Sequence, residues 1–186
     1  MTIIHTDRLV IRESSGKDFS RIYAMMLSVS QEETTDVVSS DENEELEKYL
    51  AYIHTVYSVF GFGLWTVCLK PEDPDCDGEG FSQSGSQLSG NQEGCIIGRC
   101  GLQPVADENS PLGRIELGYL IDQGFRGKGY AYEACRAILD HAFVKLGIEE
   151  IFVHISLGNE ASAALAGKLG FRMWDGDMWI LRNPLL

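Results

Sequence analysis

Apolar residues recur three and four positions apart in four segments of the chain, which is the spacing of an amphipathic helix. Polar Asp18 precedes the first segment, and the first turn of the second is rich in glutamate, which suits the positive end of a helix dipole. Gly147 and Gly170 follow the third and fourth segments, where a glycine commonly ends a helix. We therefore expect helices over residues 19–27, 41–58, 128–146 and 160–169.

Short apolar runs rich in β-branched and aromatic residues separate these helices and predict strands. The last two runs form a hairpin around Asp175-Gly176-Asp177, and the helix over 128–146 is a crossover between two strands. This order predicts a mixed α/β (α+β) fold with one central mixed sheet of about six to seven strands and about four flanking helices. We expect one domain over residues 1–186, without an internal repeat. The strands are expected at residues 9–12, 61–69, 95–102, 114–121, 151–155, 171–174 and 178–181.

Residues 71–94 differ from the rest of the chain in composition. They are rich in Asp, Glu, Ser, Gly and Gln and contain no Lys or Arg. We interpret them as a flexible, polar hairpin loop between two strands. Cys76 and Cys95 flank this loop and are able to meet across it. However, an odd total of five cysteines without C-x-x-C spacing argues against a disulfide framework or a zinc site, so we expect reduced thiols and no metal.

Charge and hydropathy exclude several classes of protein. The formal net charge is −13, which argues against a nucleic-acid binder, because such a protein needs a basic surface. The acidic balance is compatible with a cationic acceptor such as an amine, but the simpler interpretation is an acidic surface that keeps a protein in solution. No apolar stretch reaches the length of a membrane helix, and the N-terminus lacks the order of a signal peptide. We expect a cytoplasmic protein with no membrane partner, either a monomer or a homodimer.

The segment 117–131 carries the first chemical signal. A predicted strand runs into a loop with Gly124, Gly127 and Gly129, and the loop opens a helix. Helix N-termini expose unpaired N–H groups, and glycines let the backbone approach an anion closely. Arg126 and Lys128 add positive charge, so the segment predicts a pyrophosphate cradle. Neither the P-loop pattern nor the dinucleotide fingerprint is present, and the loop alone is also compatible with a glycine-rich turn that binds nothing.

A second motif lies downstream, over residues 159–171, and it gives the loop a specific meaning. It runs Asn159-Glu160-Ala161-Ser162-Ala163-Ala164-Leu165-Ala166-Gly167-Lys168-Leu169-Gly170-Phe171. Together with the loop of residues 126–131, it resembles the GNAT superfamily of N-acetyltransferases, and residues 6–12 resemble the start of its RimJ/RimL branch of ribosomal-protein N-terminal acetyltransferases. The likeness covers most of the chain except residues 71–94. The coenzyme A loop pattern [QR]-x-x-G-x-[GA] is met by Arg126, Gly129 and Ala131. The pattern of the later helix, N-x-x-[SA]-x-x-[LY]-x-x-K-x-G-F, is met by Asn159, Ser162, Leu165, Lys168, Gly170 and Phe171.

This resemblance implies that acetyl-CoA is the cosubstrate and assigns residues to it. The strand at Tyr119, Leu120 and Ile121 is expected to pair its backbone with the pantetheine arm, as an added strand would. An amide of Leu120 or Ile121 then polarises the thioester carbonyl. Asn159 is expected to contact the pantetheine arm. The pyrophosphate is expected at the amides of Arg126, Gly127, Lys128, Gly129, Tyr130 and Ala131.

Transfer to an amine also requires a base, because an alkyl ammonium has a pKa of about 10 and must lose a proton before it attacks. Glu116 is the candidate catalytic residue, since the resemblance implies a glutamate on this strand. Strand alternation places Glu116 with Gly118 and Leu120, opposite Leu117 and Tyr119, unless a bulge shifts the phase. The competing interpretation is a solvated or salt-bridged glutamate beside Arg114.

One position departs from the pattern of the family. The resemblance implies a tyrosine in the late helix as the acid for the leaving thiolate, and this chain has Ala166 there. Ser162, Ser156 or water can take that role, or the thiolate leaves unaided. The competing interpretation of Ser162 is a structural one, as the small residue that this position of the helix requires. The function predicted is therefore transfer of an acetyl group from acetyl-CoA to a primary amine, either a protein N-terminus or a small amine. The alternatives are a domain that senses acyl-CoA without turnover and an enzyme that uses another acyl donor.

Overall fold

The computed structural model describes residues 3–29, 38–76, 94–107 and 110–184. They form a single eight-stranded sheet with the order β1-β2-β3-β4-β5-β6-β8-β7. Neighbouring strands are antiparallel, except that β5 and β6 are parallel. The strands are β1 (Ile3–His5), β2 (Leu9–Arg12), β3 (Leu64–Leu69), β4 (Cys95–Asp107), β5 (Ser110–Ile121), β6 (Glu150–His154), β7 (Arg172–Asp175) and β8 (Met178–Arg182).

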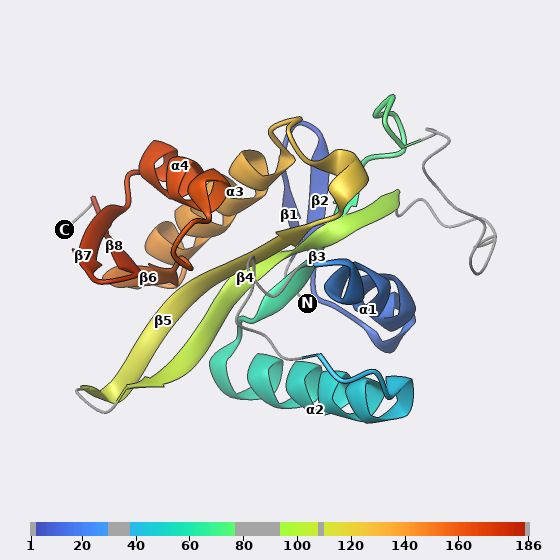
Figure 1. The fold of residues 1–186 in the computed structure, drawn as a ribbon, viewed down its shortest axis with the longest axis horizontal. Helices are drawn as coiled ribbons and strands as arrows, with labels where there is room; N and C mark the ends of the chain where they lie inside the picture. Colours follow the sequence, from blue (N-terminus) through green and yellow to red (C-terminus); the bar gives the residue numbers. More distant parts are fainter. Residues whose placement is uncertain (1–2, 30–37, 77–93, 108–109, 185–186) are drawn as a thin grey trace.

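Helices cover both faces of this sheet. Figure 1 shows α3 (Tyr130–Val144) and α4 (Glu160–Leu169) on one face, and α1 (Phe19–Ser28) and α2 (Glu42–Phe60) on the other. Two short 3₁₀ turns, η1 (Gly16–Asp18) and η2 (Gln123–Phe125), precede α1 and α3. The mixed α/β fold with four flanking helices is therefore confirmed. Among the described residues, no helix is long and apolar enough to cross a membrane.

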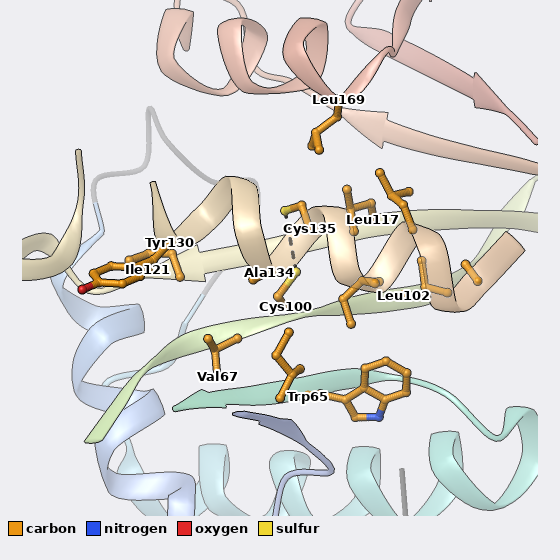
Figure 2. Packing of buried hydrophobic residues seen from close by; sticks show 14 of the residues in the cluster. Trp65, Val67, Cys100, Leu102, Leu117, Ile121, Tyr130, Ala134, Cys135 and Leu169 are labelled. Carbon is orange, nitrogen blue, oxygen red and sulfur yellow. Dashed lines mark hydrogen bonds between the residues drawn. The ribbon is translucent and has the colours of Figure 1, made fainter. Parts of the chain in front are cut away.

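The largest part of the core lies between the sheet and α3. Figure 2 shows Ala134 and Cys135 of α3 facing β4 and β5, with Trp65 and Val67 on β3, the strand next to β4 in the same sheet. Cys100 and Cys135 are both buried free thiols whose sulfur atoms lie 3.7 Å apart. The residues that α3 buries recur at the three- and four-residue spacing from which the helix was predicted. Burial of these apolar side chains therefore determines which face of α3 packs on the sheet.

The sheet differs from the expectation at two places. It has eight strands rather than six to seven, because residues 3–5 form β1, which pairs with β2. This strand has only three residues and lies at the edge of the sheet, so it carries almost no periodic signal of its own. The other difference is a long β4–β5 hairpin, in which both strands extend beyond the predicted ends at residues 102 and 114. Pro104 and Pro111 lie in these extensions, and proline is uncommon inside a strand.

The prediction that Cys76 and Cys95 stay reduced is wrong for this structure. The two cysteines form a disulfide, because the turn of residues 71–76 after β3 brings Cys76 to the first residue of β4. The sequence showed that the two cysteines flank the loop, but whether they meet depends on how β3 and β4 pair. The predicted flexible loop falls mostly on residues 77–93, which lie outside the described residues.

A buried ion pair organises the opposite face of the sheet. Asp18 is only 2% exposed and accepts two hydrogen bonds of 2.8 Å from the guanidinium of Arg12 on β2. It also accepts from the backbone N–H of Ser15 and the hydroxyl of Thr66. Burial alone would raise the pKa of Asp18, but these hydrogen bonds outweigh burial and lower the pKa below its ordinary value. The pair therefore ties the start of α1 to β2 and β3.

Replacing Asp18 by asparagine is expected to lower the free energy of unfolding by about 3 kcal/mol, because the buried charge of Arg12 then loses the carboxylate that bonds to it twice. Urea unfolding at neutral pH measures this change. The matched control is Asp140→Asn, whose pair with Arg136 on α3 has both side chains 58% exposed. The control should change the free energy by less than about 0.5 kcal/mol. Equal effects of the two substitutions would contradict the assignment.

The same carboxylate gives the stability a pH dependence. The folded-state pKa of Asp18 lies below its ordinary value, so its contribution is complete above the ordinary carboxyl pKa of about 3.9. The contribution should disappear as the pH falls through the lower pKa of the folded state. Unfolding curves between neutral and acid pH should therefore converge for the native protein and the Asp18→Asn variant. A constant difference between them across this range would argue against the assignment.

Candidate active site

The candidate site begins where two parallel strands separate. The ladder between β5 and β6 pairs Glu116 with Phe152, and no further ladder pair joins the two strands within the described residues. Beyond this point β4 stays paired with β5 as far as Ile121, while β6 stays paired with β8. Figure 1 shows the remaining part of β5 running on without β6 beside it. The edge of β5 that faces β6 is therefore open to another partner beyond Glu116.

A cleft of about 780 Å³ occupies this region. Its walls come from β5, the loop before α3, the start of α4, and parts of α1, β3 and β4. Because β6 leaves β5, the cleft reaches residues from both faces of β5, such as Glu116 and Tyr119. All the predicted site residues except Lys128 line it: Glu116, Tyr119, Leu120, Ile121, Arg126, Gly127, Gly129, Tyr130, Ala131 and Asn159.

The predicted pyrophosphate loop has the backbone that its glycines suggested. Gly127 and Gly129 have φ angles of 76° and 87°, which lie in the left-handed region that favours glycine. Gly129 is the N-cap of α3, so the first amides of this helix open at the cleft. The guanidinium of Arg126 turns back and donates from Nε to the carbonyl of Ile121 at 3.0 Å. Backbone amides and the positive end of the α3 dipole thus meet at one wall.

The side chains of Lys128 and Tyr130 are engaged outside this wall. The ammonium of Lys128 bonds to a carboxylate oxygen of Asp75 at 2.8 Å, in the turn after β3. The phenol of Tyr130 donates to Asp75 at 2.6 Å and lies 3.1 Å from an oxygen of Asp73. Burial and these carboxylates raise the pKa of Tyr130. The two residues therefore offer their backbone to the loop, while their side chains anchor it to the neighbouring turn.

The opposite wall is the first turn of α4. The side-chain oxygen of Asn159 accepts from the backbone N–H of Ser162 at 3.0 Å, so Asn159 is the N-cap of α4. The hydroxyl of Ser162 lies 2.7 Å from the phenolic oxygen of Tyr119, a contact between α4 and β5. Burial is the main reason that the pKa of Tyr119 rises to about 12. Tyr119 therefore remains a neutral phenol at physiological pH.

Glu116 lies at the point where β5 and β6 separate. It pairs across the ladder with Gln103 of β4, and the register is regular here, since the irregularity in this ladder lies at Val105 and Asp107. The predicted alternation therefore holds along this part of β5. The Nε atom of Arg114 is 3.6 Å from a carboxylate oxygen of Glu116, whose side chain is 16% exposed. Glu116 is thus both a cleft residue and a member of a salt bridge.

Several cleft residues were missed from the sequence. Gln103 and Arg99 of β4 and Leu64 of β3 line the cleft on the α1 side. Charged Arg99 and polar Gln103 interrupt an otherwise apolar strand. This interruption is the sequence feature from which a role in a cleft could have been predicted. Ala166, at the position of the expected tyrosine, is buried and supplies no hydroxyl. Among the described residues, no group of three or more His, Cys, Asp or Glu side chains is placed to hold a metal ion.

Comparison with known proteins agrees with this geometry. A relative from Bacillus subtilis strain 168, the uncharacterized protein YkkB, is 38% identical over 77 residues, which are 41% of this chain and 44% of the relative. The match thus spans less than half of that protein. An acetyltransferase structure from Agrobacterium tumefaciens C58 superposes with a TM-score of 0.70 at 23% identity, covering 97% of this chain and 92% of that one.

The fold is also shared with the branch that residues 6–12 suggested. A RimL ribosomal L7/L12 alpha-N-protein acetyltransferase, solved with coenzyme A, superposes with a TM-score of 0.66 at 15% identity. The alignment covers 97% of this chain and 98% of RimL. The family profile of the acetyltransferase (GNAT) domain matches residues 8–172, which is most of the chain. With its fold, its glycine loop and this match, the chain belongs to the GNAT family of acetyltransferases.

Proposed function

We propose that this protein transfers an acetyl group from acetyl-CoA to a primary amine by direct attack of the amine on the thioester. The observation that carries the proposal is the cleft at the separation of β5 and β6. The glycine loop lies at one wall of the cleft, α4 at the other, and Glu116 at the position where β5 pairs with β6. Such a cleft supplies anion-binding amides, an open strand edge and a carboxylate to one reaction.

The residues present fit the cofactor half of this reaction. The loop of residues 126–131 leads into the start of α3 at the wall of the cleft, and all of its residues except Lys128 line the cleft. At the start of a helix, a pyrophosphate is stabilised by N–H groups and by the helix dipole. The open edge of β5 at Tyr119, Leu120 and Ile121 offers backbone groups to the amide-containing pantetheine arm. An amide of Leu120 or Ile121 then donates to the thioester oxygen as negative charge develops on it. Asn159 reaches the arm from α4.

Glu116 is proposed as the base in the acceptor half. An ammonium acceptor must lose a proton before its nitrogen attacks, and a carboxylate in the cleft accepts that proton directly or through water. The salt bridge to Arg114 keeps Glu116 in place beside the end of the β5–β6 ladder. A formal net charge of −13 also favours the approach of a cationic acceptor over that of an anionic one.

The leaving thiolate needs a hydrogen-bond donor or a proton. Ser162 is the better placed of the two serines considered from the sequence, because its hydroxyl is held at 2.7 Å from the phenol of Tyr119. Ser156 also lines the cleft and serves as the matched comparison. A neutral Tyr119, with its pKa raised to about 12, keeps a proton in this pair at physiological pH. Ser162 is therefore proposed as the donor to the thiolate.

Glu116→Gln is expected to lower kcat by roughly a hundredfold to ten-thousandfold, which is the range for loss of a general base. Free-thiol release from acetyl-CoA with a panel of primary amines measures it. The variant should recover activity as the pH rises toward the amine pKa, because the neutral amine then forms without help. Glu150→Gln, in an exposed pair with Arg182, is the matched control and should act like the native protein. A pH profile unchanged by Glu116→Gln would remove Glu116 from the mechanism.

Ser162→Ala is expected to lower kcat about tenfold or more with acetyl-CoA, and Ser156→Ala is expected to change it little. The deficit of the Ser162 variant should shrink with acetyl thioesters of more acidic thiols, since a weaker base needs less protonation as it leaves. Steady-state rates across a series of such thioesters measure this trend. An equal deficit for every thioester would contradict the role of Ser162.

One observation keeps the second function in view. Ala166 supplies no hydroxyl, which is what a domain that binds acyl-CoA without turnover would also show. The thiol-release panel separates the two functions. A domain without turnover would bind coenzyme A but release no thiol with any amine, whereas an acetyltransferase would release thiol with at least one amine. A preference for another acyl donor, such as succinyl-CoA, would appear in the same assay as faster release.

The proposal covers two classes of acceptor, because a protein N-terminus and a small amine both fit the chemistry of the cleft. It places the reaction in the cytoplasm, without a nucleic-acid or membrane partner. The proposed enzyme has one acetyltransferase domain and acts as a monomer or a homodimer. An acceptor screen tests the class of acceptor, and sizing of the purified protein tests whether it is a monomer or a homodimer.

A further inference from the structure

The turn between β1 and β2 contacts the glycine loop, although the proposed reaction uses none of its residues. Thr6 and Arg8 lie in and beside this turn, about 120 residues before the loop in the sequence. They belong to the opening segment that resembles the RimJ/RimL branch. Their side chains do not line the cleft, so any part they have in the reaction must act through other residues.

Glu133, in the first turn of α3, accepts hydrogen bonds from both Thr6 and Arg8. One of its carboxylate oxygens accepts from the hydroxyl of Thr6 at 2.6 Å and from the backbone N–H of Arg8 at 2.9 Å. The other accepts from Nε and Nη2 of Arg8, each at 2.7 Å. Burial alone would raise the pKa of Glu133, but the bonds from Thr6 and Arg8 outweigh it and lower the pKa. Glu133 is therefore a carboxylate at physiological pH.

The same guanidinium reaches past Glu133 to the loop itself. Nη1 of Arg8 donates to the carbonyl of Lys128 at 3.1 Å, and the guanidinium carbon lies 4.3 Å from the ring centroid of Tyr130. Lys128 and Tyr130 flank Gly129, whose positive φ begins α3. Arg8 thus holds the residues on both sides of the glycine that orients the first amides of the helix.

Only an arginine makes this set of contacts at once. Its planar fork offers donors in several directions, so one side chain bonds to Glu133 with two nitrogens and to the Lys128 carbonyl with the third. Lysine carries the same charge on a single nitrogen and cannot span the three positions. A loop with two left-handed glycines has many alternative conformations, and such a tie reduces them.

We propose that Arg8, anchored by Glu133, is a positioning residue for the pyrophosphate loop of residues 126–131. It fixes the carbonyl of Lys128 and the ring of Tyr130, so that the amides at the start of α3 are already aimed at the cleft. This inference rests on the proposed function, because it concerns the same coenzyme A loop. Without this contact the loop spends part of its time in conformations that do not bind coenzyme A. The apparent affinity then falls in proportion to the fraction of molecules whose loop is in the binding conformation.

The experiment compares two acyl donors in the full-length protein. Arg8→Ala should raise KM for acetyl-CoA roughly tenfold with little change in kcat, as a loss of pre-organisation predicts. The kcat/KM for S-acetyl-pantetheine, which has no pyrophosphate, should stay that of the native protein. Arg8→Lys should resemble Arg8→Ala rather than the native protein. Arg136→Ala, which removes the exposed Arg136–Asp140 pair of the same helix, is the matched control and should leave both donors unaffected.

A double-mutant cycle and hydrogen exchange make the test specific. Glu133→Gln should give the same donor selectivity as Arg8→Ala, and the double variant should be no worse than the single ones, because the two residues act as one unit. Amides of residues 127–131 should exchange faster in Arg8→Ala, whereas those of β6 should not. Thermal unfolding shows whether each variant is folded.

The outcomes separate this inference from the proposed function. Equal losses with both donors, or unchanged KM for acetyl-CoA, would overturn the positioning role while the native activity stands. If the native protein neither binds nor turns over acetyl-CoA, the proposed function fails. The exchange measurement then decides the clamp alone, and unchanged exchange in the loop would overturn it.

Discussion

The site depends on the loss of strand pairing between β5 and β6 immediately after Glu116 and Phe152. Backbone groups in a sheet need partners, and a parallel pair that ends within the sheet leaves one edge of β5 without them. Because β4 and β8 still hold the two strands from outside, the separation is a stable feature of the fold. It also lets one cleft reach both faces of β5, so Glu116 from one face and Tyr119 from the other contribute to the same space.

Positive charge around the glycine loop is largely compensated by carboxylates. Arg8 is paired with Glu133, and Lys128 is paired with Asp75, so neither cation is aimed at the cleft by itself. In the proposed coenzyme A site, the attraction for the pyrophosphate at this wall then comes mainly from oriented N–H groups and the dipole of α3. Backbone amides have fixed positions and lose little conformational freedom on binding. In the proposed positioning role, the network of side chains around the loop holds these amides in place.

The predictable part of the molecule was the part encoded by local patterns. Periodicity identified the four helices, alternation gave the facing of Glu116, and glycine spacing located the turn before α3. The missed features depend on contacts between distant segments: the short edge strand β1, the bond between Tyr119 and Ser162, and the capture of Lys128 by Asp75. The disulfide belongs with them, since the pairing of β3 with β4 brings its cysteines together. Contacts between residues that are distant in the sequence cannot be predicted from periodic patterns within one segment.

The disulfide also changes how the chain is connected. Cys76 and Cys95 are 19 positions apart, and they join the turn after β3 to the start of β4 at the base of the intervening segment. The backbone between them is therefore not the sole covalent route from the first part of the protein to the second. If a protease cut the chain once between these cysteines, the two fragments would stay linked until a reductant was added. They would remain one molecule on a gel without reductant and separate into two on a gel with it.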